Sequence, residues 1–159
     1  MIEINNYNTN SSLYNLHKKI IQNVQFSKDL SLANREELFI KDICKRIEKS
    51  TSVLYVFKND DDIIGLIALS VTLINKQPSI QIDYIFISNQ YRGQELEILD
   101  NTKPFRYLIE FTISIAKKLQ KQLGIKYIVL SPDTDDLQDK YQKLKFNKID
   151  SKWMFLKLK

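Results

Sequence analysis

Apolar residues recur along the chain with two periods, one helical and one alternating, and these periods predict the secondary structure. A weak alternation over residues 2–7 predicts a short edge strand. Ser11 and Ser12 then offer an N-cap to a first helix. The helically spaced apolar residues of this helix are Leu13, Leu16, Ile20, Ile21 and Val24. The chain is therefore expected to open with a strand followed by a helix.

A second helix is predicted over residues 34–49. Glu36 and Glu37 fall in its first turn, where the helix dipole favours acidic side chains. Cys44 lies among the apolar positions, so we interpret it as a core residue rather than a nucleophile. The apolar residues that form one stripe are Leu38, Ile40, Ile43, Cys44 and Ile47.

Three strands are predicted next. Residues 53–57 and 63–71 are β-branched and apolar runs separated by a polar segment, which is typical of an antiparallel hairpin. Asp60, Asp61 and Asp62 in that segment resemble a metal-binding cluster, but their place between two strands favours a turn. A third strand begins near Ser79 and leads into a turn at residues 92–93.

A long helix follows this turn. Residues 104–123 carry a wide apolar stripe, and Gly124 is expected to end the helix. Beyond it, the pattern predicts a buried strand over 127–130, a short helix over 135–144, and a final strand or hairpin over 148–158. Strand, turn, helix and strand in this order suit a cofactor with a pyrophosphate, because a helix N-terminus offers N–H groups and the positive end of its dipole.

The predicted order is β, α, α, β, β, β, α, β, α, β, with room for one more strand. Helices that interrupt a mixed sheet, with one parallel strand–helix–strand crossover, make an α/β or α+β sandwich. The length of 159 residues suits a single domain over residues 1–159.

Composition narrows the class of protein. No apolar run approaches the roughly 18 residues that a membrane span needs, so no membrane partner is expected. Residues 1–10 lack the basic and apolar regions of an export signal. Cys44 is the only cysteine, which excludes an intrachain disulfide and a multi-cysteine metal site. A reducing, cytoplasmic location is expected.

The positive charge is unevenly distributed. The net charge is +5, and lysines gather in the last third of the chain. A basic face would suit a nucleic acid or a coenzyme with several phosphates. A solvated lysine surface is the simpler interpretation. The lysines concerned are Lys117, Lys118, Lys121, Lys126, Lys140, Lys143, Lys145, Lys148, Lys152, Lys157 and Lys159.

Two motifs carry a resemblance to a known family. The stretch IFISNQYRGQ at residues 85–94 joins a strand to an Arg-Gly turn, and YQKLKF occupies residues 141–146. Together with the element order, they resemble the GNAT superfamily of N-acyltransferases over nearly the whole chain. The resemblance implies a mixed, mostly antiparallel twisted sheet flanked by helices. It also implies acetyl-CoA as a co-substrate and direct transfer of the acetyl group to a primary amine, without a metal ion.

The resemblance assigns acetyl-CoA to the turn and to the start of the helix after it. Glu95 and Glu97 stand where the family has two glycines, whose missing side chains let backbone N–H groups close on a pyrophosphate. The approach to the helix is also longer than in a typical member, by roughly ten residues. The implied ligands are Ile85, Phe86, Ile87, Arg92, Gly93, Gln94, Lys103, Phe105, Arg106 and Thr134.

Two outcomes are open for this approach. In the first, residues 95–100 bulge away and the N–H groups of Phe105 and Arg106 meet the phosphates. Arg92, Lys103 and Arg106 then add counter-charge. In the second, the cofactor site is degenerate, and the arginines only neutralise the neighbouring acids.

Two residues are implied in catalysis. Tyr141 matches the tyrosine of the family pattern Y-E-K-L-G-F, which stands close to the cofactor's sulfur, so it is the candidate general acid for the departing thiolate. The alternative is a helix tyrosine that packs on the sheet. Asp83 is the candidate general base for the attacking amine, with an exposed surface charge as the alternative. Backbone N–H groups near Phe86 and Ile87 would polarise the thioester carbonyl.

Other polar residues have structural interpretations. His17, the only histidine, is expected to face solvent on the first helix. Asp133, Asp135 and Asp136 suit a loop that caps the next helix, because their spacing lacks the glycine and closing glutamate of a calcium loop.

The acceptor amine is left open. A small molecule, a protein amine or an aminoacyl-tRNA would each fit, with contacts expected from Tyr14, Phe26 and Trp153. A homodimer is also left open. The alternatives are a toxin-like acetyltransferase that acts on aminoacyl-tRNA and a non-catalytic module of the same fold that has lost acetyl-CoA binding.

Overall fold

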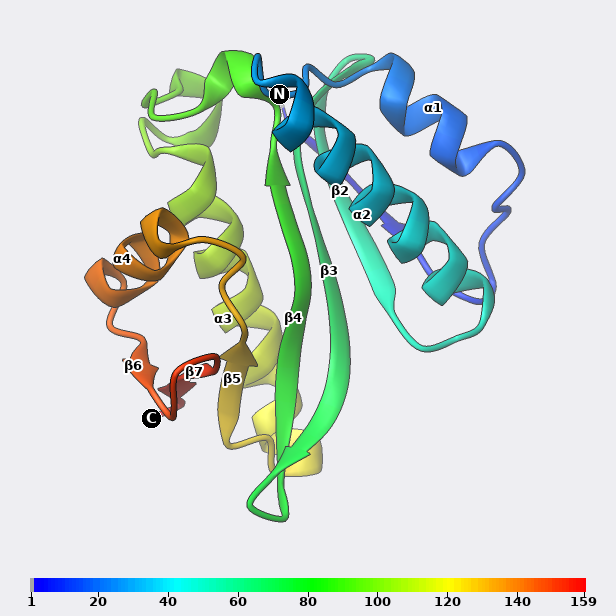
Figure 1. The fold of residues 1–159 in the computed structure, drawn as a ribbon. Coiled ribbons are helices and arrows are strands. Elements are labelled where there is room, and N and C mark those ends of the chain that lie inside the picture. Colours follow the sequence, from blue (N-terminus) through cyan, green and yellow to red (C-terminus); the bar gives the residue numbers. More distant parts are fainter. Residues whose placement is uncertain (1) are drawn as a thin grey trace. The chain divides into compact units, whose positions relative to one another are not determined.

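The helices and strands of the computed structural model, which describes residues 2–159, follow the predicted order (Figure 1). The strands are β1 (Glu3–Tyr7), β2 (Val53–Asn59), β3 (Asp62–Ile74), β4 (Gln77–Ile87), β5 (Tyr127–Leu130), β6 (Asn147–Lys148) and β7 (Met154–Lys157). The helices are α1 (Leu16–Gln22), α2 (Leu30–Glu48), α3 (Pro104–Leu123) and α4 (Asp135–Lys143), with short 3-10 turns η1 (Asn89–Tyr91) and η2 (Glu97–Leu99). The predicted element types are confirmed.

The strands form one mixed sheet in the order β1-β2-β3-β4-β5-β7-β6. β4 and β5 pair in parallel, and the chain passes between them through α3. The pairs β1–β2, β2–β3, β5–β7 and β6–β7 are antiparallel. The predicted class, a mixed and mostly antiparallel sheet with helices, is therefore confirmed, and the last predicted segment is a strand pair.

The described residues group into two compact units. Unit 1 contains the chain up to Leu69 together with Asp83–Leu108, and unit 2 contains Ser70–Ile82 and Ile109–Lys159. β3, β4 and α3 each contribute residues to both units. The single domain inferred from chain length remains a prediction.

Unit 1 is built around an apolar core between its helices and its strands. α2 lies along β2 in Figure 1, and its buried face meets apolar residues of β2 and β3. Phe26 and Tyr84 pack at the border of this core. The buried residues are Leu16, Ile20, Ile40, Ile43, Cys44, Ile47, Leu54, Val56, Ile63, Leu66, Ala68 and Phe86. Cys44 is a core residue, as predicted, and burial raises the pKa of its thiol to about 11.

The start of α2 differs from the prediction. Asp29 caps the helix by accepting a hydrogen bond from the Leu32 N–H at 2.9 Å, so α2 begins at Leu30 rather than at residue 34. The assignment of Glu36 and Glu37 to the first turn was therefore wrong. Leu38 is 65% exposed and does not belong to the buried stripe.

The start of α1 also differs. The helix begins at Leu16, after Asn15 in the left-handed region, and no side chain caps it. Ser11 instead accepts a hydrogen bond from the Asn8 N–H at 3.0 Å, so the predicted serine cap was wrong. His17 is half-buried, and its Nε2 atom is buried without a hydrogen-bond partner, contrary to the solvent-facing position that we expected.

Unit 2 has its own core along α3. Gly124 ends this helix at a φ of +67°, as predicted, and its N–H donates to the Gln120 carbonyl at 3.0 Å. The Lys126 N–H donates to the Pro78 carbonyl at 2.8 Å, which ties β5 to β4. The buried apolar residues include Ile80, Ile82, Ile109, Ala116, Ile125, Ile128, Val129, Leu130, Phe146, Met154 and Leu158.

Membrane-spanning helices and metal-binding clusters are both absent from residues 2–159. None of the helices in this range is long and apolar enough to cross a membrane. Within the same range, no group of three or more His, Cys, Asp or Glu side chains is placed to hold a metal ion.

Asp60 has a φ of +56° between the paired residues Asn59 and Asp62, which confirms the predicted hairpin turn.

Candidate functional site

The C-terminal end of β4 is held in place from several sides. The parallel register of β4 with β5 ends at the pair Gln81–Val129, and β4 continues to Ile87. A Cβ atom at Gly65 of β3 would lie 2.8 Å from the Phe86 carbonyl oxygen, so the two backbones approach closely here. Ser88, directly after β4, accepts a hydrogen bond from the Gln25 N–H at 2.6 Å. The end of β4 is therefore a tightly fixed piece of backbone.

The Arg-Gly turn follows directly. Gly93 has a φ of +75°, and a Cβ atom built on it would meet nothing within 4 Å. The Gln94 side chain donates to the Gln90 carbonyl at 2.8 Å. Asp62 accepts hydrogen bonds from the Tyr91 hydroxyl and from the Gln90 amide, which anchors the turn to the start of β3.

The side chain of Arg92 points toward Ser27 and Glu36, the latter on α2. Its Nη2 atom lies 2.8 Å from Glu36 Oε2, its Nη1 atom donates to Ser27 Oγ at 2.6 Å, and its Nε atom donates to the Ile87 carbonyl at 2.7 Å. The guanidinium also lies 5.4 Å from the centroid of the Phe86 ring. Its charge is thus already balanced by Glu36.

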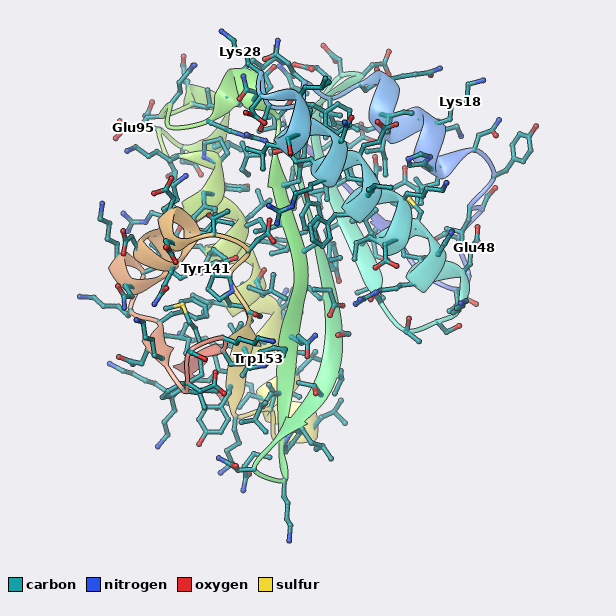
Figure 2. The ribbon with its side chains drawn as sticks, in the orientation of Figure 1. Lys18, Lys28, Glu48, Glu95, Tyr141 and Trp153 are labelled. Atoms are coloured by element: carbon teal, nitrogen blue, oxygen red, sulfur yellow. The ribbon has the colours of Figure 1, made fainter. Side chains whose placement is uncertain are left out.

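The lengthened approach to α3 forms an excursion over residues 95–102, and phosphate binding at the start of α3 remains a prediction. Leu96 and Thr102 form an isolated antiparallel bridge, and the Leu99 side chain is fully buried beneath the turn. Asp100 and Asn101 take left-handed conformations, which closes the turn tightly. The acidic residues of the excursion are exposed, and Figure 2 shows Glu95 pointing outward from this segment.

α3 begins with basic residues close by. Lys103 and Arg106 are exposed, and no acidic residue lies in the first turn. The Lys103 carbonyl accepts the Tyr107 N–H at 3.0 Å, so the helical hydrogen bonds start at Lys103. Phe105 is half-buried. A 20-residue helix directs the positive end of its dipole toward its start, where acidic residues are usual and cations are not. This arrangement fits a phosphorylated ligand.

Asp83 is buried. Its side chain is 1% exposed, so it is not a surface charge. Oδ2 accepts a hydrogen bond from Ser52 Oγ at 2.8 Å, and Oδ1 lies 3.6 Å from Arg46 Nη1. Arg46 also pairs with Asp42 at 3.0 Å. These contacts hold the carboxylate of Asp83 in one orientation, and its role as a base remains a prediction.

Two further candidate residues for the acetyl-CoA site, Thr134 and Tyr141, lie in unit 2. Thr134 caps α4 by accepting the Leu137 N–H at 3.2 Å. Tyr141, labelled in Figure 2, is 2% exposed, and its ring meets the Phe146 ring edge-on at a centroid distance of 5.3 Å. Burial raises the pKa of its phenol above the usual value. The hydroxyl therefore keeps its proton at neutral pH and can serve as a hydrogen-bond donor.

The second motif, YQKLKF, makes a left-handed turn at its fifth residue. Lys145, which stands where that pattern has glycine, has a φ of +77°. Its N–H donates to the Gln142 carbonyl at 3.0 Å, and the Phe146 N–H donates to the Tyr141 carbonyl at 3.1 Å. A left-handed residue at this position explains why glycine suits the pattern.

Three residues expected at the acceptor have different surroundings. Tyr14 is 79% exposed. Phe26 packs against Phe86, with ring centroids 5.7 Å apart, beside the end of β4. The backbone of Trp153 closes the turn before β7, since its N–H donates to Asp150 at 2.8 Å. Their contact with an acceptor remains a prediction.

Solved structures share this architecture over almost the whole chain. The AtaT toxin, as a point mutant bound to the C-terminus of the antitoxin AtaR, has a TM-score of 0.75 at 11% identity, covering 99% of this chain and 92% of that one. The same complex with acetyl-CoA has a TM-score of 0.73 at 12% identity, with 99% and 94% covered. AtaT complexed with acetyl-methionyl-tRNAfMet has a TM-score of 0.71 at 11% identity, with 99% and 95% covered. The chain has the GNAT fold.

The GNAT fold was the one that the two sequence motifs implied. A comparison with protein-family models and one with curated proteins found no match to the sequence. At identities this low, the likeness establishes the architecture but not the chemistry.

Sequence analysis missed the partners that hold the candidate site. Glu36 and Ser27 bind the Arg92 guanidinium, and Ser52 and Arg46 contact Asp83. One signal for Glu36 was present in the sequence. It precedes Ile40 by four residues and Ile47 by eleven, so it lies on the buried stripe of α2, where a carboxylate needs a partner.

Proposed function

We propose that the protein is an N-acetyltransferase that moves the acetyl group of acetyl-CoA to a primary amine. The proposal rests on three features that occur together on the GNAT fold. These are the fixed end of β4, the Arg-Gly turn that follows it, and the basic start of α3. Structures of AtaT that share this fold include one with acetyl-CoA.

The residues of the chain have separate roles in this proposal. Acetyl-CoA supplies the activated acetyl thioester. Lys103 and Arg106 attract its phosphates at the start of α3. The backbone of Phe86 and Ile87 orients the thioester, and Asp83 receives the amine proton directly or through water. The Tyr141 hydroxyl donates a hydrogen bond to the departing thiolate.

One observation favours an aminoacyl-tRNA as the acceptor. Unit 2 holds twelve lysines against six acidic residues, a net charge of +6, whereas unit 1 holds twelve basic and thirteen acidic residues. On α3, Lys117, Lys118 and Lys121 share one open groove with Glu110 and Ser114. A lysine-rich surface suits a phosphate backbone. AtaT, which shares the fold, has a structure with acetyl-methionyl-tRNAfMet.

The proposal is tested by transfer of a radiolabelled acetyl group. The full chain is incubated with labelled acetyl-CoA and, in separate reactions, with methionyl-tRNA, spermidine, or a peptide with a free N-terminus. We expect label in at least one acceptor, and transfer to tRNA that falls steeply as salt is raised. Absence of label from all three acceptors, in a protein that does not bind acetyl-CoA, favours the non-catalytic module. A flat salt response removes tRNA as the acceptor.

A further inference from the structure

Glu36 is a buried acidic residue that the proposed chemistry does not use. Its side chain is 11% exposed, and it lies on the stripe of α2 that also carries Ile40 and Ile47. Removing a carboxylate from water costs free energy unless the carboxylate is paired and hydrogen-bonded. The contacts of Glu36 therefore indicate why a carboxylate stands there.

Both oxygens of Glu36 have partners. Oε1 accepts the Ser27 N–H at 2.9 Å, and Oε2 accepts the Ser27 hydroxyl at 2.8 Å. Oε2 also lies 2.8 Å from Nη2 of Arg92, whose Nη1 donates to the same Ser27 hydroxyl at 2.6 Å. The three side chains form a closed network, which is more rigid than a single ion pair.

The network reaches the backbone that would hold the acetyl group. Arg92 donates from Nε to the carbonyl of Ile87, the last residue of β4, at 2.7 Å, and its guanidinium lies 5.4 Å from the centroid of the Phe86 ring. The guanidinium thus contacts Glu36 through Nη2 and Ile87 through Nε. Because Glu36 balances its charge, Arg92 is better suited to positioning β4 than to supplying counter-charge to a phosphate.

We propose that Glu36 is a positioning residue that acts through Arg92. It holds the segment Phe86–Ile87 and the turn at Gly93 in the conformation that binds the acetyl thioester. This inference rests on the proposed function, because it concerns the site for acetyl-CoA.

The substitution Glu36→Gln distinguishes the two roles of Arg92 by the sign of its effect. If Arg92 is held in position by Glu36, the Kd for acetyl-CoA, measured by calorimetry, rises about tenfold, a change of about 1.4 kcal/mol. If Arg92 is a counter-charge, removing the negative partner frees its charge, and acetyl-CoA binds more tightly. Glu37→Gln is the matched control, since this neighbour on α2 is exposed and the change in net charge is the same.

Arg92→Lys gives a second test. Lysine keeps the positive charge but loses the forked geometry, so we expect the same weakening as with Glu36→Gln. The double variant should bind no more weakly than either single variant, because both changes break one network. If each substitution instead weakened binding by destabilising the protein in general, the losses of affinity in the double variant would add. If Glu36→Gln does not fold, Arg92→Lys alone decides, and wild-type affinity in it contradicts the positioning role.

The outcomes separate this inference from the proposed function. A wild-type chain that does not bind acetyl-CoA contradicts the proposed function. A wild-type chain that binds acetyl-CoA, with a Glu36→Gln variant that binds equally well or better, contradicts only the positioning role of Glu36.

Discussion

Replacing Tyr141 by phenylalanine is expected to lower turnover about 100-fold, while the Kd for acetyl-CoA changes by no more than about threefold. The substitution removes one hydroxyl from a buried ring and leaves the packing against Phe146 in place. Burial raises the pKa of this phenol above its usual value of about 10, so the hydroxyl stays protonated throughout the neutral pH range. The donated hydrogen bond is therefore lost at every pH where the enzyme would act.

Initial rates at saturating acetyl-CoA, together with calorimetric affinities, check this result. Tyr127→Phe is the matched control, because Tyr127 also lies in unit 2 with its ring edge-on to another ring, that of Phe155, at 5.9 Å. This control should retain wild-type turnover. Equal losses of turnover and affinity in Tyr141→Phe would identify a structural tyrosine instead.

Replacing Gly65 by alanine is expected to lower the free energy of unfolding by about 2 kcal/mol and to weaken acetyl-CoA binding as well. The added methyl group would lie 2.8 Å from the Phe86 carbonyl oxygen and 3.0 Å from Ile87 Cδ1, so β3 or β4 must move. A shift of Phe86 displaces the segment proposed to hold the thioester. Binding and stability should therefore fall together.

Urea unfolding and calorimetry measure the two effects. Gly124→Ala adds the same methyl group where it meets nothing within 4 Å, at a φ of +67°. The control should lose about 1 kcal/mol through backbone strain and keep its affinity for acetyl-CoA. Wild-type stability and affinity in Gly65→Ala would contradict the close approach of the two strands.

The elements that could be predicted from the sequence are those fixed by local periodicity. α3 and β5 have the predicted bounds, because each is set by a run of apolar residues and by local signals such as Gly124. The start of α2 was misplaced by four residues, since Asp29 supplied a cap that the apolar pattern did not mark. The GNAT fold was predictable because the element order and two short motifs agreed.

The interior of the candidate site was less predictable. The pair of Arg92 and Glu36 joins residues 56 positions apart, and no local period reports such a contact. Arg92 was assigned to the phosphates from its position in the motif. The direction of its side chain, however, depends on Glu36 of α2. The partner of Asp83 could not be predicted for the same reason, because Ser52 lies directly before a different strand, β2.

The most direct test of the proposed function is a calorimetric titration of the full chain with acetyl-CoA. We predict saturable binding at one site per chain, weakened at least tenfold, or about 1.4 kcal/mol, by the double substitution Lys103→Glu and Arg106→Glu. The same charge change at Lys117 and Lys118, farther along α3, should leave the affinity unchanged. Absence of saturable binding by the wild-type chain at millimolar acetyl-CoA would contradict the proposed function.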